Sequence, residues 1–157
     1  MQVLTTQDII TLFPEHKLRD LAPPDGDAVD WGVLDYLGWV HPSGHVGYAI
    51  VPHGDELKTL TLRRSTHTEG RPRSHMCSWC HFVHRARGAA MFCATVAGTD
   101  GRRIIGNMLC SNLDCSVRIR NLTGDPPGFM PETVDLERKI ERLQNALLIF
   151  LSRANKL

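Results

Sequence analysis

The chain has 157 residues, of which 42% are hydrophobic and 22% are charged. These values are ordinary for a globular protein and exclude a chain that is disordered throughout. No apolar run reaches the roughly 18 residues that a membrane-spanning helix needs. The first residues, MQVLTTQDIITLF, have no basic stretch and no small-residue cleavage site, so they do not form a signal peptide. We therefore expect a cytoplasmic protein with no membrane partner, whose cysteines stay reduced.

The formal net charge of +1 hides an uneven distribution. Residues 1–60 hold three lysines or arginines and nine acidic residues, whereas residues 61–128 hold ten arginines, no lysine and four acidic residues. A basic middle next to an acidic front is typical of a surface that faces a partner, although many such surfaces only contact solvent.

The first predicted element is a short helix that ends before Pro14, with Thr5 or Thr6 as its cap and Asp8 in its first turn. A loop rich in Pro, Gly and Asp follows. The stretch WGVLDYLGWV then brings two tryptophans, a tyrosine and two leucines close together, so we expect it to pack as core or as a lid.

Two β-hairpins are predicted next. Residues 46–53 and 58–65 are rich in β-forming residues, with the turn residues GDE between them. The polar residues 65–75 are interpreted as a loop. Two more strands are predicted at 89–98 and 102–109, joined by the turn signal GTDG.

Two helices complete the chain. A helix is predicted at 111–121, because Ser111 and Asn112 are both good caps. One long helix is predicted from about Pro131, where Asp135 and Lys139 form an i,i+4 ion pair. Apolar residues recur along it at spacings of four and three, namely Leu136, Ile140, Leu143, Leu147 and Phe150. This stripe is shorter than a coiled coil needs, so we expect it to pack on the rest of a monomer.

Four of the five cysteines fall into two close pairs. Cys77 and Cys80 are spaced C-x-x-C, and Cys110 and Cys115 are spaced C-x-x-x-x-C, with a predicted hairpin between the pairs. Zinc accepts four thiolates in a tetrahedron, and a tight turn lets two sulfurs reach one ion. A cysteine turn, a hairpin and a helix start that carries the last ligands follow the order of a treble-clef zinc finger. The predicted fold class is therefore α+β, with antiparallel β-hairpins, a treble-clef zinc finger and a long C-terminal helix.

The four cysteines also allow other interpretations. A redox C-x-x-C usually opens a helix after a strand, whereas here a loop leads in and a hairpin follows. Four unconnected buried thiols are a further alternative. His75, His81 or His84 could replace a cysteine, but four cysteines already complete the tetrahedron, and Cys93 is interpreted as a core residue. A closed shell of four thiolates has no open position, so we predict a structural zinc ion and no enzyme.

The stretches DWGVLDYLGWVHPSGHVGYAIV, MCSWCH and NMLCSNLDCSVRIRN resemble the C-terminal treble-clef domain of the FusB-type family, over roughly residues 28–155. These proteins bind elongation factor G, and some of them confer fusidic-acid resistance by helping the stalled factor to leave the ribosome. The resemblance implies a zinc-binding domain that contacts elongation factor G. It also implies four zinc ligands, Cys77, Cys80, Cys110 and Cys115.

The resemblance also sets the expected domain organisation. The longer resistance proteins carry an additional N-terminal helical bundle, whereas here only residues 1–27 precede the shared part. We therefore divide the chain into an N-terminal helix and linker at 1–27 and a zinc-finger domain at 28–157. This departure bears on drug rescue more than on the zinc site.

Two classes of partner stay open, elongation factor G and an RNA or the ribosome. Ten arginines surround the zinc motif and could pair with carboxylates or with phosphates, namely Arg63, Arg64, Arg71, Arg73, Arg85, Arg87, Arg102, Arg103, Arg118 and Arg120. We predict that Arg118, Arg120 and Arg103 contact the partner, because the metal fixes the helix that carries the first two. Arg118 and Arg120 point about 200° apart on a helix, so only one of them should face the partner. The alternative is that both pair with acids of this chain.

Overall fold

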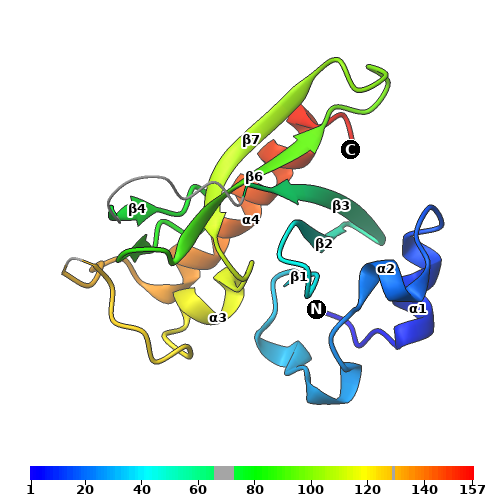
Figure 1. The fold of residues 1–157 in the computed structure, drawn as a ribbon. Helices are drawn as coiled ribbons and strands as arrows, with labels where there is room; N and C mark the ends of the chain where they lie inside the picture. Colours follow the sequence, from blue (N-terminus) through cyan, green and yellow to red (C-terminus); the bar gives the residue numbers. More distant parts are fainter. Residues whose placement is uncertain (66–72, 129) are drawn as a thin grey trace.

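The computed structural model describes residues 1–65, 73–128 and 130–157 (Figure 1). Most of the loop predicted at 65–75 therefore lies outside the described residues. Five antiparallel strands form the main sheet in the order β1-β2-β3-β6-β7, and two short strands form a second ribbon. Their bounds are β1 Leu37–Val40, β2 Val46–His53, β3 Glu56–Arg64, β4 His75–Met76, β5 Val83–His84, β6 Ala89–Thr95 and β7 Ile104–Cys110.

The helices lie at the two ends of the chain and after β7. Their bounds are α1 Thr6–Leu12, α2 Leu18–Leu21, the 3-10 turns Gly26–Ala28 and Trp31–Val33, α3 Cys115–Ile119 and α4 Leu136–Arg153. Helix α1 begins as predicted, because the Asp8 amide donates to the Thr5 hydroxyl and the Thr5 amide donates to the Asp8 carboxylate. Among the described residues, no helix combines the length and the apolar character that crossing a bilayer demands.

Both predicted hairpins form. Strands β2 and β3 pair from Val46 opposite Arg63 to His53 opposite Glu56, around a two-residue loop at Gly54 and Asp55. Gly54 has a positive φ of 59°, which glycine adopts at little cost. Strands β6 and β7 pair along their whole lengths, and this hairpin extends away from the body of the molecule (Figure 1).

The sheet carries a hydrophobic cluster on each face, because alternate residues of a strand point to opposite sides. On one face, Leu60, Leu62 and Phe92 pack with α4 and with the cysteine-bearing segments. On the other face, Trp39 and Tyr48 pack with the N-terminal helices. The position of α4 behind β6 and β7, and of α1 and α2 beside β2, can be followed in Figure 1.

The N-terminal segment is part of the second cluster. Ile9, Phe13 and Leu21 are buried there. The Trp39 indole donates a hydrogen bond to the Leu21 carbonyl at 2.7 Å, and the Tyr48 hydroxyl donates to the Asp20 carbonyl at 2.7 Å. The domain division at residue 27 stays a prediction, and residues on its two sides share this cluster.

The predicted helix at 111–121 is wrong in its extent, since α3 covers only Cys115–Ile119. Ser111 and Asn112 lie in a turn instead of capping a helix. Leu113 has a φ of 57°, in the left-handed region, so a right-handed helix cannot run through it. The turn places the two ligand candidates of this segment at the end of β7 and at the start of α3.

The long C-terminal helix is confirmed, but it begins at Leu136 rather than near Pro131. Asp135 caps it by accepting a hydrogen bond from the Arg138 amide at 2.9 Å. The Asp135 carboxylate also lies 3.6 Å from the Arg138 side chain, so Asp135 pairs with Arg138 and the predicted pair with Lys139 is wrong.

The apolar stripe of α4 packs on the chain along most of its length. Leu143, Leu147 and Phe150 are buried in the first cluster, and Ile140 is half-buried against it. Leu136, at the start of the helix, is 45% exposed, so its predicted burial is wrong.

Replacing Leu143 with alanine should therefore destabilise the protein. A fully buried leucine loses its transfer energy and leaves a cavity, so Leu143→Ala should lower the free energy of unfolding by about 2–5 kcal/mol in urea titrations. Ile149→Ala, on the exposed side of the same helix, should change it by less than about 0.5 kcal/mol. Equal effects of the two changes would contradict this packing.

Candidate metal centre

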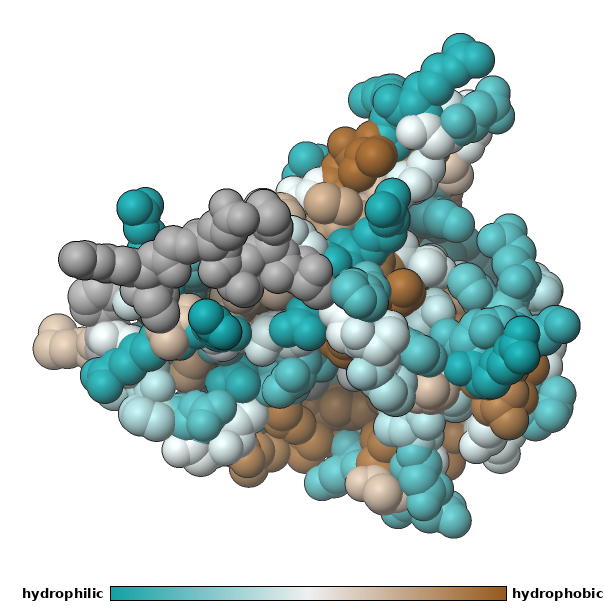
Figure 2. All heavy atoms as spheres, viewed as in Figure 1, coloured by the Kyte–Doolittle hydropathy of each residue, from teal (hydrophilic) through white to brown (hydrophobic). Residues whose placement is uncertain are grey.

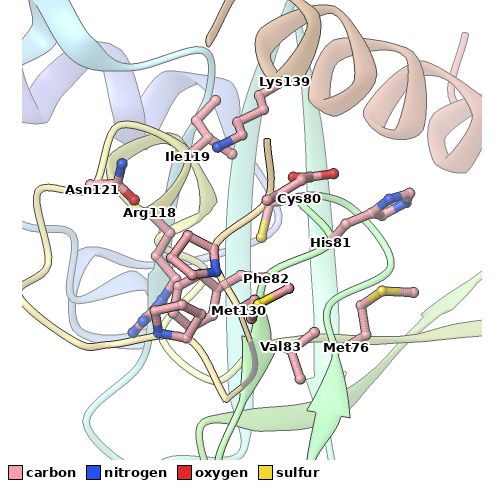
Figure 3. Close-up of a pocket in the computed structure, with 13 residues that line it drawn as sticks. Met76, Cys80, His81, Phe82, Val83, Arg118, Ile119, Asn121, Met130 and Lys139 are labelled. Atoms are coloured by element: carbon pink, nitrogen blue, oxygen red, sulfur yellow. The ribbon is translucent and has the colours of Figure 1, made fainter. Parts of the chain in front are cut away.

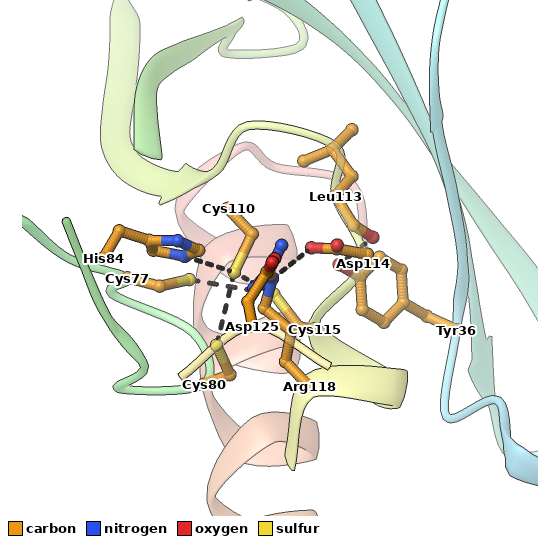
Figure 4. A network of polar contacts seen from close by, with 10 residues as sticks. All are labelled: Tyr36, Cys77, Cys80, His84, Cys110, Leu113, Asp114, Cys115, Arg118 and Asp125. Carbon is orange, nitrogen blue, oxygen red and sulfur yellow. Dashed lines mark hydrogen bonds and ion pairs between the residues drawn. The ribbon is translucent and has the colours of Figure 1, made fainter. Parts of the chain in front are cut away.

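Three separate parts of the chain bring four thiols together (Figure 4). Cys77 and Cys80 lie in the turn between β4 and β5, Cys110 ends β7, and Cys115 begins α3. All four side chains are buried, and their sulfur atoms lie within 4.8 Å of one another. The two cysteine pairs that are close in sequence thus meet in space as one cluster.

The spacing of the sulfur atoms fits a tetrahedral zinc site. Zinc–thiolate bonds of about 2.3 Å in a tetrahedron place sulfur atoms about 3.8 Å apart. The Sγ atoms of Cys77 and Cys115 are 3.7 Å apart, those of Cys110 and Cys115 are 3.7 Å apart, and those of Cys80 and Cys110 are 3.4 Å apart. Four thiolates also form a complete shell, with no position for water or a substrate.

The cluster cannot hold four negative charges without a cation. Burial disfavours the thiolate of Cys77, but hydrogen bonds from the other three thiols outweigh burial and lower its pKa well below the usual range. Burial and the same neighbours raise the pKa of Cys115 well above the usual range. Without a cation, a first thiolate therefore disfavours a second one, because the two negative charges would be buried side by side. A divalent ion removes this penalty.

His84 supports the cluster from one side. Its Nε2 atom lies 3.2 Å from the Cys110 sulfur, and its ring packs on Phe82 with centroids 4.8 Å apart. Gly88 leaves room for the ring, because a Cβ at this position would lie 2.4 Å from Nδ1 of His84. His84 thus lies beside the thiols, where a ring N–H can stabilise a thiolate. The other two histidines near the motif, His75 and His81, are half-buried and exposed.

Tyr36 supports the loop between Cys110 and Cys115. Its hydroxyl donates a 2.6 Å hydrogen bond to the Leu113 carbonyl, and its ring packs edge-on against Trp79. Tyr36 is fully buried, and this burial raises its pKa well above the usual range. The WGVLDYLGWV stretch is therefore core, and no pattern in the sequence predicts this particular hydrogen bond.

Arg118, predicted as a partner contact, lies inside the chain. Its side chain is only 5% exposed and lies over the Phe82 ring at 5.0 Å. Its guanidinium donates to Asp114 at 2.8 Å and to Asp125 at 3.1 Å. These ion pairs join α3 to the segment that follows it, next to the cysteine cluster (Figure 4).

Arg120 and Arg103 differ in exposure. The Arg120 guanidinium donates to both Asp35 oxygens, at 2.6 and 3.3 Å, and to the Ser116 carbonyl at 2.8 Å. It therefore fixes α3 to the N-terminal part of the chain, as the alternative interpretation expected. Arg103 is exposed where the turn of the β6–β7 hairpin leads into β7. Binding of a partner by any of the three arginines stays a prediction.

A cavity of about 470 Å³ opens beside the cysteine cluster (Figure 3). Phe82, Val83 and Ile119 form apolar parts of its wall, and Lys139 reaches it from α4. Cys80 also belongs to this wall. A side chain that filled the cavity would therefore touch the turn that carries the first two cysteines.

Residues 15–154 match the profile of the FBP C-terminal treble-clef zinc-finger family. The chain belongs to this family. Together with the four-thiol cluster, membership makes it a zinc-binding protein of the α+β treble-clef class, as the sequence predicted. The FusB-type resemblance is thereby confirmed.

The fold is similar to that of the fusidic acid resistance protein FusC, with a TM-score of 0.61 at 15% sequence identity. The match covers 98% of this chain and 59% of FusC, so the chain spans little more than half of that protein. At this identity the likeness concerns the fold alone. No curated protein matches the sequence.

The metal cluster predicts a clear difference between its cysteines and Cys93. Cys77→Ser and Cys115→Ser should lose zinc and unfold much of the protein, since binding of structural zinc contributes on the order of 10 kcal/mol. Cys93 lies in β6 outside the cluster, so Cys93→Ser should retain one zinc ion per chain. Elemental analysis of the purified proteins measures the zinc content per chain. Wild-type protein without zinc, or Cys93→Ser protein without zinc, would contradict the assignment.

The ion pair of Arg120 predicts a second effect on stability. Asp35 is only 5% exposed, so Arg120→Met leaves a buried carboxylate without its counter-charge. The free energy of unfolding should fall by about 3–5 kcal/mol in urea. Adding Asp35→Leu should restore most of the loss, because the stranded charge is then removed. An unchanged urea midpoint for Arg120→Met would show that the pair does not hold α3.

Proposed function

We propose that this chain is a non-enzymatic zinc protein that binds translation elongation factor G. The observation that carries the proposal is the closed cluster of Cys77, Cys80, Cys110 and Cys115, which we propose as the zinc ligands. A metal with four thiolate ligands has no open position for catalysis, so its role is to shape a surface. Membership of the treble-clef family and the FusC-like fold support elongation factor G as the partner.

The metal fixes the elements that would carry this surface. Cys110 is the last residue of β7 and Cys115 the first of α3, so one ion would hold the base of the β6–β7 hairpin and the start of the helix. A surface held rigid before binding loses less conformational entropy when the complex forms. Zinc would thereby contribute to affinity without touching the partner.

The outer part of the β6–β7 hairpin has the composition of a protein interface. Ile104 is 58% exposed, and Met91 is also exposed on the same hairpin. Arg103 is exposed beside Ile104. Arginine and methionine are enriched at protein interfaces, whose centres are apolar. Figure 2 shows hydrophilic side chains at the tip of the hairpin and an apolar patch just below them. We propose that Arg103 contacts elongation factor G here, while Arg118 and Arg120 hold α3 in place.

Titration calorimetry with purified elongation factor G tests the proposal. Wild-type protein should bind, and Arg103→Glu should weaken binding about tenfold, because a reversed charge at the rim opposes an acidic partner. Arg138→Glu is the matched control, since Arg138 is also exposed but lies on α4. Absence of binding by the wild type would overturn the proposal, and equal weakening by both variants would overturn the proposed face. Release of the factor from ribosomes stalled by fusidic acid can be measured with the same proteins.

A further inference from the structure

The described arginines of residues 61–128 fall into two groups, those that bond to this chain and those that are exposed. Arg118 and Arg120 are in ion pairs with the chain's own acids. Arg64 is half-buried, and its guanidinium donates to the Gly44 carbonyl at 3.4 Å. Arg71 lies outside the described residues. The other six arginines are exposed, and we call them the arginine track: Arg63, Arg73, Arg85, Arg87, Arg102 and Arg103. Within the part of the chain that the structure describes, none of the six is in an ion pair.

The arginine track follows the β6–β7 hairpin from its base to its tip. Arg85 and Arg87 lie in the turn that leads into β6. Arg73 comes two residues before His75, which pairs with His84, so it lies near this turn. Arg63 lies opposite Cys93, partway along β6. Arg102 and Arg103 precede β7 at the tip. A strand as long as β6 spans about 23 Å. The track is therefore far longer than one ion pair.

Few acidic groups balance the arginine track. Of the acids in residues 61–128, Asp114 and Asp125 are bound to Arg118, Asp100 is exposed at the tip, and Glu69 lies outside the described residues. Many of the acids of residues 1–60 belong to the segments around α1 and α2, which pack beside β1 and β2 at the far edge of the sheet. Most described acidic side chains therefore lie away from the arginine track. The track matches a partner with closely spaced negative charges.

The chemistry of the arginine track suits phosphate groups. The planar guanidinium binds phosphate with two parallel hydrogen bonds, as it also binds carboxylate, and this region has no lysine. Among the described aromatic residues nearby, Phe92 and Trp79 are fully buried, and half-buried Phe82 has the Arg118 guanidinium over its ring, so they offer no platform for stacked bases. Contacts to phosphates alone position a protein on a nucleic acid but do not read its sequence.

We propose that the arginine track, apart from Arg103 at its tip, binds the phosphate backbone of base-paired RNA, without regard to sequence. The choice of RNA rests on the proposed function, because elongation factor G works on the ribosome, whose surface is rich in helical RNA. The hairpin then has two kinds of contact. Ile104 and Arg103 near its tip suit a protein, and the arginines at its base suit the RNA beside that protein.

Binding of an RNA duplex of arbitrary sequence to the purified protein tests this proposal. Fluorescence anisotropy is measured at several salt concentrations between about 50 and 200 mM, without elongation factor G. Each neutralised phosphate contributes about −0.9 to the slope of log K against log salt on a duplex, so four or five contacts predict a slope between about −3.5 and −4.5. The double variant Arg85→Gln, Arg87→Gln should bring the slope closer to zero by about 1 to 2.

The matched control is the double variant Lys17→Gln, Arg19→Gln. It removes the same charge from exposed positions at α2, which packs beside β1 and β2 at the far edge of the sheet, and should leave the slope unchanged. Zinc content shows that each variant is folded. No RNA binding at 50 mM salt, a slope near zero, or equal effects of both double variants would overturn the proposal.

A third outcome would assign the arginine track to a protein. If Arg85→Gln, Arg87→Gln weakens binding to elongation factor G while the wild type binds no RNA, the track faces an acidic protein surface and the RNA proposal is wrong. The RNA titration contains only this chain and the duplex. Its failure therefore leaves the calorimetric test of elongation factor G binding untouched.

Discussion

The rest of the structure depends on the attraction between one divalent cation and four buried thiolates. Without the cation, Cys77 can ionise only at the expense of its neighbours, because each further thiolate would be a buried charge beside another. With it, the β4–β5 turn, the end of β7 and the start of α3 are joined at one point. The same three elements also belong to one hydrophobic cluster, so the ion adds to the packing that holds them together.

Other interactions connect the cysteine cluster to two further parts of the chain. The Tyr36 hydroxyl and the Arg120–Asp35 ion pair connect the α3 region to the N-terminal half, and the Arg118 ion pairs connect α3 to the segment before α4. Both arginines therefore hold α3 to other parts of the chain. The exposed arginines of the β6–β7 hairpin lack such partners among the described residues.

The sequence predicted the features that depend on short-range patterns. The cysteine spacing indicated which thiols would meet, and the β-rich runs and the α4 stripe indicated the hairpins and the long helix. It did not predict features that depend on distant contacts. Ser111 and Asn112 are good caps by propensity, but Leu113 adopts a left-handed conformation whose carbonyl bonds to Tyr36, 77 positions earlier. The ion pair of Arg120 with Asp35 likewise joins residues 85 positions apart.

The two faces of the sheet differ in when their residues are synthesised. The cluster on the α1 and α2 side draws only on residues up to Leu57. The other cluster needs Cys115 and then α4, the last helix of the chain. During translation, the first face can therefore form while the second is still incomplete. Until Cys115 has emerged, Cys77 and Cys80 are an exposed dithiol that can be oxidised or can bind a foreign metal. Because of this order of synthesis, the two thiols are most open to unwanted reactions before zinc binds.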